Sequence, residues 1–136
     1  MTTDVLDALR QVNATSAFNK WAGFELAVAH GGVAELRLAS RPDLLQYSGF
    51  LHAGVIGAMI DTACGFAAAS VAGNVLASQY QVMCYAPAIG DVFITRARVT
   101  RAGKRQLFAT AELFAERAGV EKLVSAPVHY WDTDSR

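Results

Sequence analysis

The sequence is short of charged residues and of cysteine. Only 18% of its 136 residues are charged, and twelve basic residues balance twelve acidic ones. A chain without net charge lacks the excess of positive charge that bulk binding to nucleic acid or to a membrane surface requires. The two cysteines, Cys64 and Cys84, form no CxxC pair and no metal-ligand spacing. We expect two buried, free thiols in a reducing cytoplasm, although the sequence leaves a disulfide open.

Several kinds of segment are also missing. The first residues, MTTDVLDALRQ, contain acids and no apolar core, so they are not expected to be a secretory signal. We find no nucleophile elbow, Walker loop, dinucleotide fingerprint or metal motif, and therefore expect neither a metal nor another cofactor. There is no linker or repeat. A length of 136 residues favours a single domain, with a helix in residues 1–20 and a loose tail in 132–136.

Apolar residues are abundant instead, at 53% of the chain. This content predicts that part of the surface is buried against another copy of the chain. The longest apolar stretch, GFLHAGVIGAMIDTACGFAAAS, runs from Gly49 to Ser70. It is long enough to cross a membrane. However, it contains His52 and Asp61, and a central aspartate costs about 2.5–3.5 kcal/mol on insertion. We interpret it as the buried helix of a soluble protein.

The hydrophobic pattern predicts the order of the elements. Short turns between the later strands indicate antiparallel neighbours, and a helix that is apolar on nearly every face must be surrounded. The expected fold class is therefore α+β, with a curved antiparallel sheet wrapped around one long central helix and a short N-terminal helix. We expect a helix at 4–20, with Val5, Leu9 and Val12 at helical spacing, and a helix at 53–72 that ends at Gly73-Asn74. We also expect a loop at 40–51, strands at 21–29, 33–39, 75–85, 92–101, 106–115 and 120–131, and turns at 90–91 and 102–104.

Asp61 is the first candidate for chemistry, because it stands inside the most apolar segment. A buried carboxylate needs partners or a raised pKa. It is either a structural residue bonded to backbone or solvent at a subunit seam, or a general base or nucleophile in a water-poor cleft. His52 lies nine residues earlier, two and a half helical turns away, so the two side chains do not share a helix face. Asp61 of one subunit could instead approach His52 of another.

The start of the long helix is the second candidate. His52 is expected to cap the helix or to fix the loop that enters it. The backbone N–H groups of Ala53 and Gly54 would lack helical acceptors there, which suits a carbonyl oxygen that becomes negative. A simply solvated helix end is the alternative. Gln46, in the preceding loop, is either a surface residue or one that orients a water or a substrate carbonyl.

A basic cluster follows in the second half of the chain. Arg96 and Arg98 share one face of a strand by period 2. The cluster is either a solvated sheet edge or a site for phosphates, with which guanidinium groups pair bidentately. Its members are Arg96, Arg98, Arg101, Lys104 and Arg105.

These residues resemble a known family. The run Gly49-Phe50-Leu51-His52-Ala53-Gly54, followed after six residues by Asp61, is similar to the signature of hotdog-fold acyl-CoA thioesterases of the PaaI-like group. Tyr85-Ala86-Pro87 with Gly90-Asp91 resembles the family's strand end and turn, and residues 98–105, RVTRAGKR, resemble its basic hairpin. The resemblance covers residues 21–131.

The resemblance implies a hotdog fold, a homodimer or dimer of dimers, and active sites at the subunit seam. It implies that Asp61 is the general base or nucleophile and that the Ala53 N–H, with Gly54 behind it, polarises the thioester carbonyl. His52 and Gln46 would support this site. Arg98, Arg101, Lys104 and Arg105 would meet the phosphates of coenzyme A.

The sequence departs from this family at four positions. One is Ala77, which stands where some relatives have a Ser or Thr in the strand, with Ser78 one step away. Gln46 stands where relatives often have Asn, Ala53 where Gly is commoner, and Gln79 where close relatives often carry an acid. Two other functions stay open on the same fold. One is hydration or dehydration of acyl thioesters, and the other is acyl-CoA binding or scaffolding without catalysis. The central Asp61 favours hydrolysis.

Overall fold

The computed structural model describes residues 2–126 and 128–132. Two helices precede a hairpin, a long helix follows, and the remaining strands complete the sheet. The elements are α1 (Thr2–Thr15), α2 (Ala17–Ala22), β1 (Glu25–His30), β2 (Val33–Ala39), the 3₁₀ turn η1 (Pro42–Leu44), α3 (Ala53–Ala72), β3 (Leu76–Tyr80), β4 (Val92–Ala102), β5 (Gln106–Arg117), β6 (Val120–Ser125) and β7 (Val128–Asp132).

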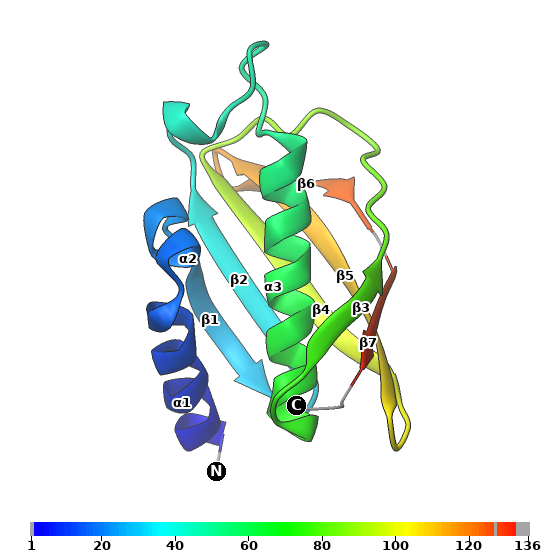
Figure 1. Cartoon of the computed structure of the whole chain (residues 1–136). Helices are drawn as coiled ribbons and strands as arrows, with labels where there is room; N and C mark the ends of the chain where they lie inside the picture. Colours follow the sequence, from blue (N-terminus) through cyan, green and yellow to red (C-terminus); the bar gives the residue numbers. More distant parts are fainter. Residues whose placement is uncertain (1, 127, 133–136) are drawn as a thin grey trace.

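The strands form one antiparallel sheet in the order β1-β2-β4-β5-β7-β3, with β6 pairing β5 beside this path. Helix α3 lies across one face of the sheet, and α1 and α2 lie along β1 (Figure 1). A long helix held in a curved antiparallel sheet confirms the hotdog fold expected from the sequence. The path ends at the edge strands β1 and β3, and β6 pairs only with β5 among the strands described.

The core lies between α3 and the sheet. Alternate residues of β2 and β4 face the helix, since Leu36 and Phe93 have no exposed surface while Glu35 is only half-buried. Met59 and Ile60 of α3 are fully buried against this face. By length and composition alone, α3 would pass as a membrane span. Its burial in this core identifies it instead as the central helix of the fold.

Both ends of α3 are fixed by the residues that the sequence pattern indicates, and the bounds Ala53–Ala72 match the prediction. His52 caps the first turn through its side chain. At the other end, Gly73 has a positive φ of 76°, which favours glycine, and its N–H closes the helix on Ala69. The face of α3 that points away from the sheet is only partly covered.

The N-terminal region differs from the prediction of one helix followed by a strand from Trp21. Ser16 ends α1 and caps α2, accepting a hydrogen bond from the Asn19 N–H. Trp21 and Ala22 are helical, and Gly23 turns the chain with a φ of 88°. Propensity alone did not reveal this break, because a capping serine inside an amphipathic pattern looks like an exposed polar residue.

Helix α1 covers the edge strand β1. The Arg10 side chain donates to the carbonyl oxygen of Leu26 at 2.9 Å, and the Asn13 amide donates to that of Phe24 at 2.9 Å. These bonds occupy backbone acceptors that a sheet edge otherwise leaves open. Helix α1 is therefore held to the sheet by two hydrogen bonds, and its Leu6 and Leu9 side chains pack against the core.

Four further predictions needed correction, two of them on the later strands. The strand expected at 75–85 ends at Tyr80, and Cys84 contributes only an isolated bridge to Ser125. The strand expected at 120–131 is two strands, β6 and β7, which pair with β5 at different places.

The cysteines and the C-terminal tail also differ from the prediction. Cys84 is exposed and only Cys64 is buried, although both thiols are free, as expected. Of the tail predicted to be loose, Asp132 belongs to β7 and 133–136 lie outside the described residues.

Candidate active site

Asp61 lies in the third turn of α3, on a side of the helix that the sheet does not cover. It is half-buried, and its Oδ1 atom is buried with no hydrogen-bond partner among the described residues. Burial raises the pKa of this carboxyl above its ordinary value of 3.8. The neighbouring Cys64 thiol has a strongly raised pKa, first because it is buried and second because Asp61 lies near it. The site therefore holds a carboxylate that is poorly solvated and more basic than usual.

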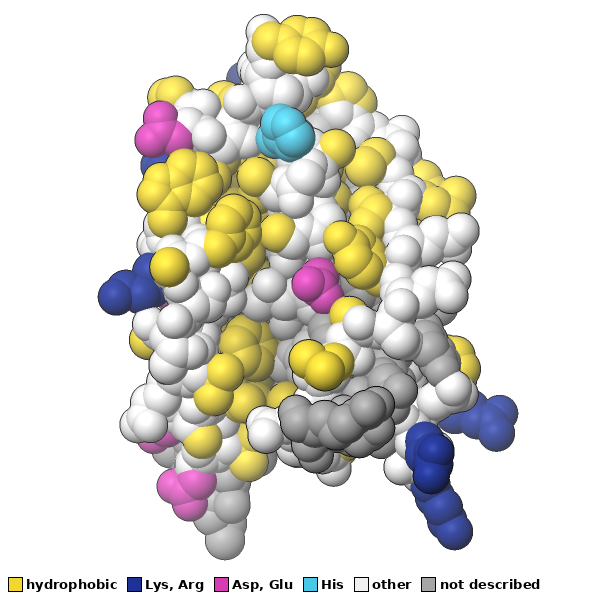
Figure 2. All heavy atoms as spheres, in the orientation of Figure 1, with side chains coloured by type: hydrophobic (Ala, Val, Ile, Leu, Met, Phe, Trp, Pro, Cys, Tyr) yellow, Lys and Arg dark blue, Asp and Glu magenta, His cyan; other side chains and the backbone are white. Residues whose placement is uncertain are grey.

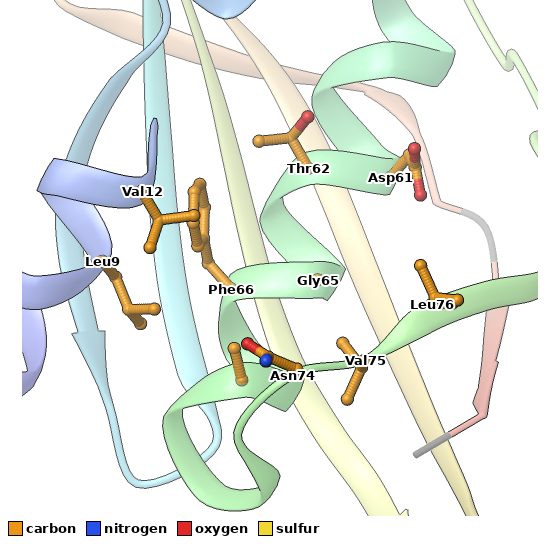
Figure 3. A pocket seen from close by; sticks show the side chains of 10 residues that line it. Leu9, Val12, Asp61, Thr62, Gly65, Phe66, Asn74, Val75 and Leu76 are labelled. Atoms are coloured by element: carbon orange, nitrogen blue, oxygen red, sulfur yellow. The ribbon is translucent and has the colours of Figure 1, made fainter. Parts of the chain in front are cut away.

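A pocket of about 450 Å³ adjoins this carboxylate. It lies over α3, between α1 and the chain that enters β3 (Figure 3). Asp61 and Thr62 stand at one end, and Asn74 stands near the other. Its apolar lining includes Leu9, Val12, Phe66, Val75 and Leu76.

The start of α3 is organised by His52. Its Nδ1 accepts a hydrogen bond from the Gly54 N–H at 2.8 Å. A Cβ at position 54 would lie 3.0 Å from that Nδ1, so glycine gives the imidazole room to approach the backbone. The expectation that Gly54 offers a free N–H is therefore wrong. The Ala53 N–H has no partner in the described part of the chain, and it is the donor that this helix end presents.

Gln46 shapes the loop before α3. Its side-chain oxygen accepts hydrogen bonds from the backbone N–H groups of Ser48 and, at 3.4 Å, of Phe50. Its backbone N–H donates to the carbonyl oxygen of Phe50 at 2.8 Å. The side-chain oxygen of Gln46, which we expected to orient water or substrate, is therefore hydrogen-bonded within the loop. Gln46 acts here as a turn-forming residue.

A second pocket, of about 430 Å³, lies at this helix start. Gln46, His52 and Ala53 line it, together with Cys84 and Tyr85 from the segment after β3. Asp61 is not among its lining residues. Eight helical residues, or about 12 Å of axis, separate Ala53 from Asp61. One chain thus places the carboxylate and the free N–H donor in two different pockets.

The basic residues are not gathered at one site. Arg98 lines a pocket on the outer face of the sheet with Arg96 and Glu112, whereas α3 covers the other face. Arg96 is engaged there, pairing with Glu35 at 3.1 Å and Glu121 at 2.8 Å. Arg101, Lys104 and Arg105 are exposed around the β4–β5 hairpin. That hairpin lies at the end of the molecule opposite the start of α3 (Figure 1).

The face that carries α3 combines these features. Hydrophobic side chains are spread over much of it, an acidic side chain lies near its middle, and basic side chains project from one end (Figure 2). Residues with at least 45% exposure include Val12, Trp21, Leu76, Tyr80, Met83 and Tyr85. So much exposed apolar surface around a half-buried carboxylate is typical of a surface that binds an apolar ligand or another subunit.

Comparison with known proteins identifies the family. The model of the thioesterase superfamily matches residues 48–122, more than half of the chain. The chain belongs to the thioesterase superfamily. A thioesterase family protein from Silicibacter pomeroyi is 30% identical, with a TM-score of 0.90 and coverage of 94% of this chain and 96% of that one. No curated protein matches.

More distant structures share the fold of this thioesterase-superfamily protein. The E. coli PaaI protein from the phenylacetic acid degradation operon is 19% identical, with a TM-score of 0.85 and coverage of 96% and 94% of the two chains. A thioesterase from Haemophilus influenzae is also 19% identical, with a TM-score of 0.82 and coverage of 93% and 88%. At this identity the likeness concerns the fold and not the substrate.

Sequence analysis missed the wall of the Asp61 pocket in this thioesterase-superfamily protein. The spacing of Leu9 and Val12 predicts the apolar stripe of an amphipathic helix, which is ordinarily assigned to the core, and Leu9 does pack against the core. Val12 is 55% exposed, however. Nothing local distinguishes a stripe that faces a core from one that faces a pocket. Among the residues that the structure describes, no three His, Cys, Asp or Glu side chains group as metal ligands.

Proposed function

We propose that the protein is an acyl-CoA thioesterase that hydrolyses a CoA-linked acyl or aryl-acyl group to the free acid and CoA. One observation carries this proposal. In a chain of the thioesterase superfamily, Asp61 presents a poorly solvated carboxylate, with one unpartnered oxygen, beside an apolar pocket. Such a group is suited to take a proton from water or to attack an electrophilic carbon.

In the general-base form of the reaction, Asp61 removes a proton from a water molecule as its oxygen attacks the thioester carbon. The carbonyl oxygen becomes negative and is stabilised by the Ala53 N–H of a second protomer, with the positive end of that protomer's α3 dipole behind it. When the carbonyl re-forms, the carbon–sulfur bond breaks and the thiol of CoA leaves. In the nucleophilic form, Asp61 bonds to the acyl carbon first, and water then cleaves the mixed anhydride.

The separation of the two pockets supports a site shared between subunits. We propose a homodimer, or a dimer of dimers, in which Asp61 of one protomer faces the His52–Ala53 helix start of its partner. The edge strand β3 and its exposed Tyr80 give this contact both open backbone and apolar area. Light scattering is expected to give a mass of at least twice 14.5 kDa. A stable, folded monomer at micromolar concentration would contradict the shared site.

The remaining parts of the proposal concern coenzyme A and location. Arg101, Lys104 and Arg105 form an exposed basic group that suits the phosphates of CoA. Two free thiols support a reducing, cytoplasmic location. No cofactor enters the proposed reaction, since water, a carboxylate and a backbone donor supply all its steps.

A panel of acyl-CoA esters, assayed with a thiol-detecting reagent, tests the proposal. Short, medium, long and aromatic acyl groups should be compared, and release of free CoA is the expected result for at least one class. The Asp61→Asn protein serves as the matched control, because it keeps the shape of the side chain and removes its basicity. An acyl-CoA-binding protein without hydrolase activity would instead bind the same esters in both forms and release no thiol from either.

A further inference from the structure

The Asp61 pocket is elongated along α3. Along α3 it runs from Asp61 to Ala69, eight residues and therefore about 12 Å of helix axis. The carboxylate stands at one end of this run, and the apolar side chains line the rest of it (Figure 3). Its volume of about 450 Å³ lies within the range of small-molecule sites, roughly 300–1,000 Å³.

Helix α1 supplies one wall of this pocket. Leu9 and Val12 extend from α1, and Phe66 extends from α3 toward them (Figure 3). The opposite wall comes from Val75 and Leu76, at the entry to β3. Helix α1 lies outside the residues 48–122 that the superfamily model matches.

We propose that this pocket binds the acyl group of the thioester and that α1 sets the acceptable length of that group. The inference rests on the proposed thioesterase function and names its substrate class. With the carbonyl carbon beside Asp61, the acyl chain runs along α3 toward Asn74. A chain of single bonds about 1.5 Å long advances somewhat less than that per bond, so 12 Å accommodates roughly eight to ten carbons. The preferred substrates are therefore medium-chain acyl-CoA esters, or arylalkyl esters of equal length.

The physical basis of this selectivity is apolar contact. Each methylene that leaves water for the pocket strengthens binding roughly fourfold, until the chain reaches the end of the wall. Val12 is the residue on α1 at which this contact is most easily changed. At 55% exposure it has space around it, so a larger side chain fits without disturbing the core. The bonds of Arg10 and Asn13 to β1 hold the helix in place.

Replacing Val12 by tryptophan tests the inference. We expect Val12→Trp to lower kcat/KM for octanoyl-CoA at least about tenfold, while butanoyl-CoA changes by less than about threefold. Gln11→Trp is the matched control, because Gln11 is exposed on the same helix and does not line the pocket. It should leave both substrates at the wild-type rate. Val12→Ala should move the preference toward longer chains.

The outcomes separate this inference from the proposed function. If wild type hydrolyses acyl-CoA esters but Val12→Trp lowers kcat/KM by the same factor for octanoyl-CoA and butanoyl-CoA, or leaves both unchanged as Gln11→Trp does, the acyl-pocket inference is overturned. The thioesterase proposal then stands. Val12→Trp could also change the mass measured by light scattering and lower the activity on all substrates equally. That result would show that a partner subunit fills the pocket, and it would also overturn the acyl-pocket inference.

A binding assay covers the case in which no ester is hydrolysed and the proposed function fails. The probes are S-octyl-CoA and S-butyl-CoA, which are thioethers and have no thioester bond to hydrolyse. Tighter binding of the octyl compound to wild type, lost selectively in Val12→Trp, would support the pocket as an apolar-chain site. Equal affinity for the two compounds would overturn it.

Discussion

The imidazole of His52 accepts a hydrogen bond from the N–H of Gly54 at 2.8 Å and so caps the helix that carries Asp61. To accept this bond, Nδ1 must be unprotonated, and the proton of the neutral ring then lies on Nε2. The same ring lines the pocket in which the Ala53 N–H stands without a partner. One residue thus fixes both the end of the helix and the surroundings of the proposed oxyanion donor.

Removing this cap should cost stability. We expect His52→Ala to lower the free energy of unfolding by about 0.5–2 kcal/mol, the usual cost of losing a helix cap. His52→Asn should recover most of that loss, because its side-chain oxygen can accept the same bond. Thermal melting of the three proteins at one pH provides the comparison. Identical melting of wild type and His52→Ala would show that the cap contributes nothing.

Asp61→Asn should separate catalysis from folding. If Asp61 activates water or attacks the thioester, kcat should fall by roughly 100-fold or more, the scale of a lost general base. Melting at pH 7 should be unchanged or improved, because a poorly compensated charge has been removed. Both quantities should be measured on one sample. Reduced stability with wild-type turnover would make Asp61 a structural residue instead.

The raised pKa of Asp61 also predicts a pH dependence of stability. Between its unfolded pKa, near 3.8, and its higher folded pKa, the folded protein binds more protons than the unfolded chain. The contribution of Asp61 is therefore most favourable below pH 3.8 and is lost as pH rises through the folded pKa. The advantage of Asp61→Asn over wild type in thermal melting should appear at neutral pH and vanish below pH 3.8. An advantage independent of pH would contradict this origin.

The basic hairpin should affect substrate binding more than chemistry. Replacing Arg101, Lys104 and Arg105 with alanine should raise KM for CoA esters more than it lowers kcat, since phosphate contacts lie far from the reacting carbon. Each lost contact should cost at most about 1.5–3 kcal/mol. Arg98→Ala, on the outer face of the sheet, should change KM less. Wild-type kinetics in the triple variant would exclude this group from the site.

Sequence alone determined the central helix and the strand pattern around it. The bounds of α3 followed from a long apolar run, a capping residue and a terminal glycine, all of which are local signals. The strand β2 and the turns before β4 and β5 followed in the same way from alternation and from glycine. Asp61 was identified because a carboxylate in an apolar run is costly wherever the run is buried.

Only the tertiary structure decided how these residues are distributed in space. It showed that the side-chain oxygen of Gln46 and the N–H of Gly54 are already bonded, which depends on a loop conformation that no spacing reveals. It placed Arg98 on the outer face of the sheet, away from α3, and divided the last predicted strand in two. It also showed that the stripe on α1, which packs against the core at Leu9, lines a pocket beside Asp61 at Leu9 and Val12. A stripe has the same pattern whatever it packs against, because periodicity fixes the face of a helix and only long-range packing fixes what that face meets.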